Sequence, residues 1–341
     1  MDKIRWPNGM SEAESGIALV TFGRTVAAQR ACDDLLLSAI GEINAVAGKK
    51  GGAITAAKAF NEVSTSLVVY YGKIIAWGRQ QTSGTSEKGT LVMIMAKSIT
   101  EARANCEHLV HGEGRESWVS RFFKATADAP DQPVAFLVDK KPDSVIAPHF
   151  HEVNQFQVIV EGSGKLGKQE VKPFVLHYTN GFTGYGPITA EDEGISFFTL
   201  RNRFDPGGAR FFPEGRSFMK PARKRHRVSD YLVLSDDEAL RSRTSEVIET
   251  AIEPEEDGLA AWFLRAVPGA KTQAPSPADG GGQYLIVARG TLLYDGEVFP
   301  ELSCVYVSAD SEPMPLEAGA EGLEVLIAQF PVAETHPPVS D

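Results

Sequence analysis

The chain has 341 residues, of which 43% are hydrophobic and 23% are charged, the proportions of an ordinary globular protein. Its formal net charge of −11 disfavours nucleic acid and anionic membranes as partners, and no apolar run reaches the roughly 18 residues of a membrane span. No apolar stretch typical of a secretory signal is present near the N-terminus, and the three cysteines lie far apart, as expected of reduced thiols. The composition therefore predicts a cytoplasmic protein, long enough for two or three domains.

Residues 1–115 are predicted to be mainly helical. Apolar residues recur at helical spacing over 36–47 and again over 60–77, which indicates a pair of antiparallel helices. The segment TLVMIMAKS (90–98) then predicts a short buried strand. Ser98, followed three residues later by Glu101, is a capping-box pattern that predicts a helix running to about His111. We assign no chemistry to this region, and a polar cluster near the end of that helix is interpreted as surface rather than as a zinc site; it comprises Cys106, His108, His111 and Glu113.

Short β-like runs separated by Gly, Pro and Asn follow over 116–203 and return over 258–333. Between them, residues 204–257 are predicted to form a linker with a helix in DDEALRSRTSEVIETA (236–251), and residues 334–341 a tail. A basic cluster in this linker, KPARKRHR at 220–227, is interpreted as a solvated segment. The alternative is that it binds a phosphate or the acidic run EPEED at 253–257.

The two β-rich regions are related by an internal repeat. QFQVIVEG at 155–162 matches QYLIVARG at 283–290, an offset of 283 − 155 = 128 residues. The same offset pairs Pro187 with Pro315, and Glu193-Gly194 with Glu321-Gly322, without a gap. Agreement of this kind indicates two β domains of one design.

The candidate functional residues lie in PHFHEVNQFQVIVEG (148–162). Side chains two residues apart on a strand share a face, so His149 and His151 converge, and two neutral imidazoles suit a transition metal. By the same alternation, Gln155 and Gln157 face the interior of the domain. The opposite face is apolar and is predicted to pack against the second β domain or another subunit; it comprises Phe156, Val158 and Val160.

These residues resemble the first motif of the cupin superfamily, in which His-x-His is followed by a glutamate and then by a glycine. His149, His151 and Gly162 fit the spacing of that motif, but Gln155 stands where cupins place a metal-binding glutamate. The turn NGFTGY (180–185) resembles the second cupin motif, with Tyr185 in the place of its histidine. The resemblance covers roughly residues 117–202 and, more weakly, 258–332.

The resemblance implies a mainly β protein with two cupin double-stranded β-helix barrels, preceded by the mostly α-helical N-terminal region. Adding 128 to His149, His151 and Tyr185 leads to positions without histidine or tyrosine, so the second barrel is expected to hold no metal; these positions are Pro277, Asp279 and Pro313. The resemblance also implies a homodimer, because cupin barrels commonly pair through their outer sheet faces.

The metal hypothesis assigns His149, His151 and Gln155 to a divalent ion, Fe, Mn, Ni or Zn, in the first barrel. Gln157, His177 and Tyr185 would then bind the substrate, and Tyr185 would act as an acid in a dioxygenase or an isomerase. Gln155 is a weaker ligand than a carboxylate, and a phenolate of Tyr185 is costly to form because its ordinary pKa is near 10.

Two alternatives to the metal hypothesis stay open, so the sequence does not decide whether the chain is an enzyme. In the first alternative, the same polar residues hydrogen-bond a small metabolite without a metal and without catalysis. In the second, they form a polar core with a structural role only. His177, eight residues before Tyr185, is interpreted as an ordinary half-buried strand histidine or as a spare ligand, since the NGFTG turn is expected to separate the two.

Overall fold

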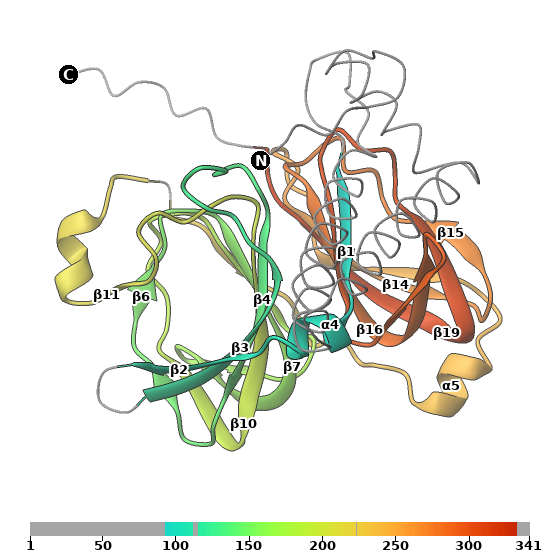
Figure 1. Ribbon diagram of the computed structural model, residues 1–341, viewed down its shortest axis with the longest axis horizontal. Coiled ribbons are helices and arrows are strands. Elements are labelled where there is room, and N and C mark those ends of the chain that lie inside the picture. The colour runs from blue at the N-terminus through green and yellow to red at the C-terminus, as the bar shows by residue number, and fades with distance from the viewer. Residues whose placement is uncertain (1–92, 112–114, 223, 333–341) are drawn as a thin grey trace, which may run out of the picture. The chain divides into compact units, whose positions relative to one another are not determined.

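The computed structural model describes residues 93–111, 115–222 and 224–332. The helical pair predicted within residues 1–92 and the tail at 334–341 lie outside this part of the chain. The described residues form a mainly β protein, as predicted, with two large antiparallel sheets that belong to one compact unit (Figure 1). None of the described helices is long and apolar enough to cross a membrane.

The first sheet has nine strands in the described part of the chain. Its hydrogen-bonded order is β12 (His226–Val228), β9 (Leu176–Thr179), β7 (Gln155–Leu166), β10 (Ile188–Arg201), β4 (Val134–Lys140), β3 (Arg115–Phe123) and β2 (Glu107–His111). Two short strands complete it, β5 (Val145–Ile146) on β10 and β8 (Gln169–Val171) on β7. A separate two-stranded ladder joins β6 (His149–Phe150) to β11 (Arg210–Phe211).

The second sheet has eight described strands and repeats this plan. Its order is β1 (Ile94–Lys97), β18 (Cys304–Val307), β16 (Gln283–Tyr294), β19 (Pro315–Gln329), β14 (Ala260–Ala266) and β13 (Val247–Ile252), with β15 (Lys271–Gln273) on β19 and β17 (Glu297–Pro300) on β16. The ends of β7 and β16 differ by 283 − 155 = 128 and 294 − 166 = 128, and those of β9 and β18 by 304 − 176 = 128 and 307 − 179 = 128. The internal repeat predicted from the sequence is confirmed.

Each sheet encloses a core of its own, and a third core lies between the sheets. Alternation along β7 and β16 produces this arrangement, because successive side chains point to opposite faces of a strand. Ile159 of β7 joins the core inside the first sheet, whereas its neighbours on β7 lie in the shared core with residues of the second sheet. These neighbours are Phe156, Val158 and Val160, and their partners include Phe263, Tyr284 and Phe330. The outer apolar face of β7 therefore packs against the second β region, as predicted.

Two helices are shorter than the sequence predicts. The capping box of Ser98 and Glu101 is present, but α4 (Ile99–Arg103) ends at Arg103, and β2 occupies the residues up to His111. Likewise α5 (Asp237–Arg241) ends early, and β13 begins at Val247. In both cases pairing with a neighbouring strand, β3 or β14, overrides the local helical preference.

Segments outside the two repeats are part of the sheets. β1, which precedes the first sheet along the chain, pairs with β18 of the second sheet, and β12, from the predicted linker, pairs with β9 of the first sheet.

The basic cluster of the linker binds the acidic run, as the alternative interpretation predicts. Arg225 pairs with Asp257 and with Glu255 (2.9 Å), and Arg227 also pairs with Glu255 (2.9 Å).

Candidate functional site

The two histidines of the motif lie together at β6, at one end of the first sheet. Both are buried, with 4% of His149 and 7% of His151 exposed, and their rings are perpendicular with centroids 5.3 Å apart. His149 Nδ1 donates a hydrogen bond to the Ala147 carbonyl oxygen (2.8 Å), which leaves Nε2 as the unprotonated nitrogen of a neutral ring. The rings converge, as the strand pattern predicts.

Two residues that the sequence did not bring to attention complete the cluster, Arg201 at the end of β10 and Asp205 just beyond it. His151 Nδ1 donates to Asp205 Oδ2 at 2.6 Å, and Arg201 Nη1 lies 3.3 Å from the same oxygen. The Nη2 of Arg201 lies 3.2 Å from Nδ1 and 3.3 Å from Nε2 of His151. Arg201 and Asp205 are both buried, so each charge depends on the other for compensation.

Gln155 joins this cluster to Tyr185. Its Oε1 accepts two hydrogen bonds from Arg201, from Nε at 2.9 Å and from Nη2 at 2.8 Å. Its Nε2 donates to the Tyr185 hydroxyl oxygen at 2.7 Å. Tyr185 also packs against His149, with ring centroids 4.5 Å apart, and the two residues pair through their backbones. The amide of Gln155 is thus held from both ends.

Burial controls the protonation of these groups. It lowers the pKa of His149 to about 4, although the Ala147 carbonyl opposes the shift. The pKa of His151 is also lowered by burial and by the Arg201 charge, against the opposing effects of Asp205 and the Gly208 backbone. Burial raises the pKa of Tyr185 above its usual range, and His151 and Arg201 hold the pKa of Asp205 below its usual value in spite of burial. Near neutral pH the site therefore has neutral imidazoles, a phenol, a guanidinium and a carboxylate.

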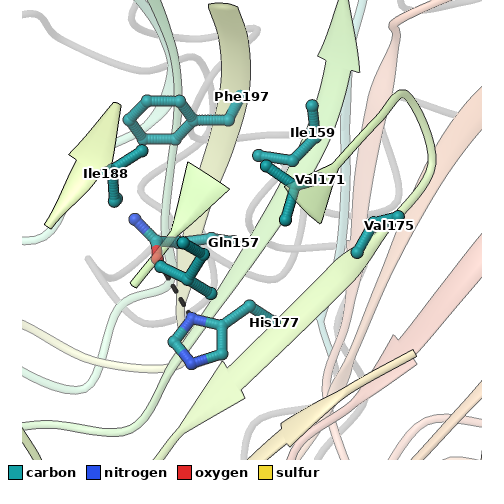
Figure 2. Close-up of a pocket in the computed structure, with 8 residues that line it drawn as sticks. Gln157, Ile159, Val171, Val175, His177, Ile188 and Phe197 are labelled. Carbon is teal, nitrogen blue, oxygen red and sulfur yellow. Dashed lines mark hydrogen bonds between the residues drawn. The ribbon is translucent and has the colours of Figure 1, made fainter. Parts of the chain in front are cut away.

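Gln157 and His177 form the inner polar end of a small cavity inside the first sheet. They face each other across β7 and β9, and His177 Nδ1 lies 3.2 Å from Gln157 Oε1 (Figure 2). Apolar side chains form the rest of the wall: Ile159, Leu166, Val171, Val175, Ile188 and Phe197. The space open to the centre of a water-sized sphere is about 10 Å³, which is room for one water molecule.

The turn between His177 and Tyr185 does not separate them, contrary to the expectation from the sequence. Their ring centroids are 5.1 Å apart, because the turn folds back onto β6. All six candidate residues are therefore neighbours of at least one other. His108 of the cluster near residue 106 lies elsewhere, on β2, where it stacks on Trp118 and pairs with Glu116.

A segment after Asp205 covers the histidines. β11 pairs with β6 beside them (Figure 1), and the Phe211 ring lies 5.2 Å from that of His149. Arg210 Nη2 pairs with Glu152 Oε1 at 3.2 Å, and the guanidinium of Arg210 stacks over Phe218 of η2 (Glu214–Phe218). Asp205 stands at the start of this cover, so the segment that hides the site also supplies its carboxylate.

The residues present do not fit a divalent metal held by His149, His151 and Gln155. The oxygen of Gln155 is already bonded twice to a guanidinium, and Nη2 of that guanidinium lies beside the His151 nitrogen that a metal would need. A divalent ion beside Arg201 would bring three positive charges into one buried site, and one carboxylate and two neutral imidazoles do not offset them. Among the described residues, no three His, Cys, Asp or Glu side chains gather as metal ligands would.

No model of a known protein family and no curated protein matches the chain. Solved structures similar to it include a Nostoc punctiforme protein provisionally described as a dioxygenase, with a TM-score of 0.47 and 11% identity over 74% of this chain and 89% of the other. The pirin YhhW of Escherichia coli in complex with nickel(II) has a TM-score of 0.44 and 11% identity, over 71% and 100% of the two chains. Oxalate decarboxylase of Bacillus subtilis has a TM-score of 0.43 and 14% identity, over 70% and 76%.

Similarity at these values gives no ground for assigning an activity, a metal or a substrate. The features of the chain itself are more specific: a two-histidine motif at β6, an interior strand β7 that begins at Gln155, and two sheets with one strand plan. In these three features, the chain resembles the cupin superfamily.

Proposed function

We propose that the first sheet holds a metal-independent site that binds a small organic molecule and transfers a proton on it, as an isomerase does. One observation carries this proposal, the buried hydrogen bond of 2.6 Å between His151 Nδ1 and Asp205 Oδ2. A carboxylate on one ring nitrogen fixes the tautomer of a histidine and stabilises the imidazolium that forms when the other nitrogen takes a proton. His151 is thereby suited to act as a general base through Nε2, once the ligand has drawn away Nη2 of Arg201, which lies 3.3 Å from that nitrogen in the structure.

Tyr185 is suited to the complementary role of acid. Burial raises its pKa and keeps its phenol protonated near neutral pH, and its oxygen already accepts the hydrogen bond of Gln155, so its own proton is left for another acceptor. The rings of His151 and Tyr185 have centroids 6.5 Å apart. A neighbouring base and acid with separated pKa values are the usual groups for moving a proton next to a carbonyl group. The base removes the C–H proton, the bond electrons form an enolate, and the acid protonates it elsewhere.

Substrate access requires the cover to move. The cavity lined by Gln157 and His177 has room for one water only, and β11 pairs with β6 at His149. A ligand that displaces Phe211 would meet His149 and Tyr185 first. The reaction is then shielded from bulk water once the cover returns.

The test measures proton exchange, which is detectable whatever product the reaction forms. The protein is incubated in D2O with a panel of 2-oxo acids, 3-oxo acids and keto sugars, and loss of the C–H signal next to the carbonyl is followed by proton NMR. We expect exchange with at least one class of compound. His151→Gln and Asp205→Asn should each slow it by about 100-fold or more, since general base catalysis contributes about 10² to 10⁴.

His108→Gln is the matched control, because His108 is a half-exposed histidine on β2, outside the cluster. Exchange that survives His151→Gln would remove His151 as the base. Binding of a panel compound, seen by ligand-observed NMR, without any exchange would favour the non-catalytic metabolite-binding protein.

A further inference from the structure

Arg201 is the buried cation of the proposed site, and an inference about its role rests on the proposed function because it concerns the same pocket. The sequence places three candidate metal ligands around one point, and the guanidinium of Arg201 lies against two of them. Its Nε and Nη2 are 2.9 and 2.8 Å from Gln155 Oε1, and Nη2 is 3.3 Å from His151 Nε2. A cation thus already stands where the motif would hold one.

The internal repeat gives an independent reason to regard Arg201 as a specific feature of this site. Position 201 + 128 = 329 is Gln329, and 155 + 128 = 283 is Gln283. In the second sheet the two glutamines simply bond to each other, Gln283 Nε2 to Gln329 Oε1 at 2.8 Å. A neutral amide pair therefore satisfies this position in the same strand plan, and the fold does not require an arginine there.

The two donors that Arg201 directs at Gln155 form a planar fork, the geometry with which guanidinium binds a carboxylate or another oxyanion. In the structure this fork is filled by the oxygen of a neutral amide, a weaker acceptor than an oxyanion. The carboxylate nearby, Asp205, contacts a different nitrogen, Nη1, at 3.3 Å and is shared with His151. Within the described part of the chain, the Nε and Nη2 edge of Arg201 therefore has a neutral partner where an anion would bind more strongly.

We propose that Arg201 replaces the metal in this site and receives an oxyanion of the ligand, a carboxylate or an enolate, in the place of Gln155 Oε1. The ligand class is a small organic acid or a carbonyl compound that forms an enolate. Gln155 would then turn from an acceptor for Arg201 into a donor or acceptor for the ligand, while it keeps its bond to Tyr185.

The first test converts the site into a metal site, and it is independent of any enzymatic activity. Calorimetric titration with NiCl2 and with MnCl2 is done on protein without a polyhistidine tag. We expect no binding to the parent and none to Gln155→Glu, in which Arg201 would pair with the new carboxylate. The double variant combines Gln155→Glu with Arg201→Gln, which introduces the amino acid found at the equivalent position 329 of the second sheet. It should bind one metal ion at least about 100-fold more tightly than the parent or Gln155→Glu alone, because it has two imidazoles, a carboxylate and no competing cation.

Stoichiometric binding to the parent that is lost in His149→Ala would overturn the proposal. So would a folded double variant, checked by circular dichroism, that binds metal no better than Gln155→Glu alone. In either case the isomerase proposal would be judged separately, by proton exchange.

The second test uses the parent protein and does not depend on the folding of the double variant. The Nε–H resonance of Arg201 in a proton–nitrogen NMR spectrum is identified by its loss in Arg201→Gln. Sodium acetate should shift it in a saturable manner, whereas acetamide, of the same shape but without charge, should not. No shift with acetate, or the same shift with acetamide, would refute the assignment of an oxyanion to Arg201.

Discussion

Gln157 and His177 face each other inside the first sheet, and the equivalent pair in the second sheet is Leu285 and Val305. The strands that carry these pairs have the same length and the same register in both sheets. The second interior is apolar at this point and folds without a polar pair. The strand plan therefore does not need a polar pair at this point of its interior, so Gln157 and His177 are there for another reason, which we take to be the site.

The largest expected effect follows from breaking the charge cluster of the first sheet. Arg201→Ala leaves Asp205 buried without its guanidinium, and removal of one partner of a buried ion pair costs about 3–5 kcal/mol of unfolding free energy. Gln329→Ala, at the equivalent position of the second sheet, removes hydrogen bonds between neutral groups and should cost about 1–3 kcal/mol. Urea unfolding of both variants measures the difference, and equal losses would contradict the special role of Arg201.

Acid should destabilise the protein through the buried histidines of the first sheet. Burial, with smaller contributions from His226 and His149, lowers the pKa of His177 to about 3, and burial lowers the pKa of His149 to about 4. Between these values and an unfolded pKa near 6.5, the unfolded chain binds more protons than the folded chain, so stability falls as pH falls. We expect a loss of a few kcal/mol between pH 7 and pH 4.

Urea unfolding at several pH values measures this loss. The double variant Gln157→Leu/His177→Val, which copies the second sheet, should show a smaller loss, because one of the two titrating histidines is gone. A pH dependence that is unchanged by the double variant would show that His177 does not contribute.

At pH 7 the same double variant tests whether the pair of Gln157 and His177 stabilises the fold. Replacing both partners of a buried hydrogen bond by apolar residues is often close to neutral, so we expect a change within about 1 kcal/mol. His177→Val alone should be worse by about 1–3 kcal/mol, since it leaves Gln157 buried without its partner. Thermal unfolding of the three proteins at pH 7 gives the ranking, and a double variant worse than the single one would mean that the interior of the first sheet has a different shape from that of the second.

The smallest effect is expected in the cover, which has no counterpart among the described strands of the second sheet. Arg210→Ala removes a partly exposed ion pair with Glu152 and should change global stability by less than about 1 kcal/mol. Local opening should nevertheless increase, so amide hydrogen exchange at Phe212, whose N–H bonds to the Pro148 carbonyl, should become several-fold faster. Lys271→Ala, which breaks a surface pair with Glu317 on the second sheet, is the control and should leave that exchange unchanged.

Local patterns in the sequence predict much of this arrangement. The 128-residue repeat predicts two related β regions, the alternation along residues 155–160 predicts which face packs between them, and the spacing of His149 and His151 places them side by side. Helix ends are predicted poorly at Arg103 and Arg241, because the strands that pair with β2 and β13, namely β3 and β14, lie outside the segments that carry the helical patterns. Arg201 could have been found from the sequence, since the repeat aligns it with another polar residue at the end of an apolar strand.

The sequence by itself determined the repeat, the two inward-facing glutamines of β7 and the pair of histidines before it, since all three depend only on the order of residues along the chain. Only the tertiary structure decided which charged groups lie beside these residues. Asp205 is 54 residues from His151 and Arg201 is 46 residues from Gln155, so no local pattern predicts their contacts. They meet because β10 pairs with β7 and because the chain beyond β10 returns over β6. This pairing brings a guanidinium and a carboxylate to the two histidines.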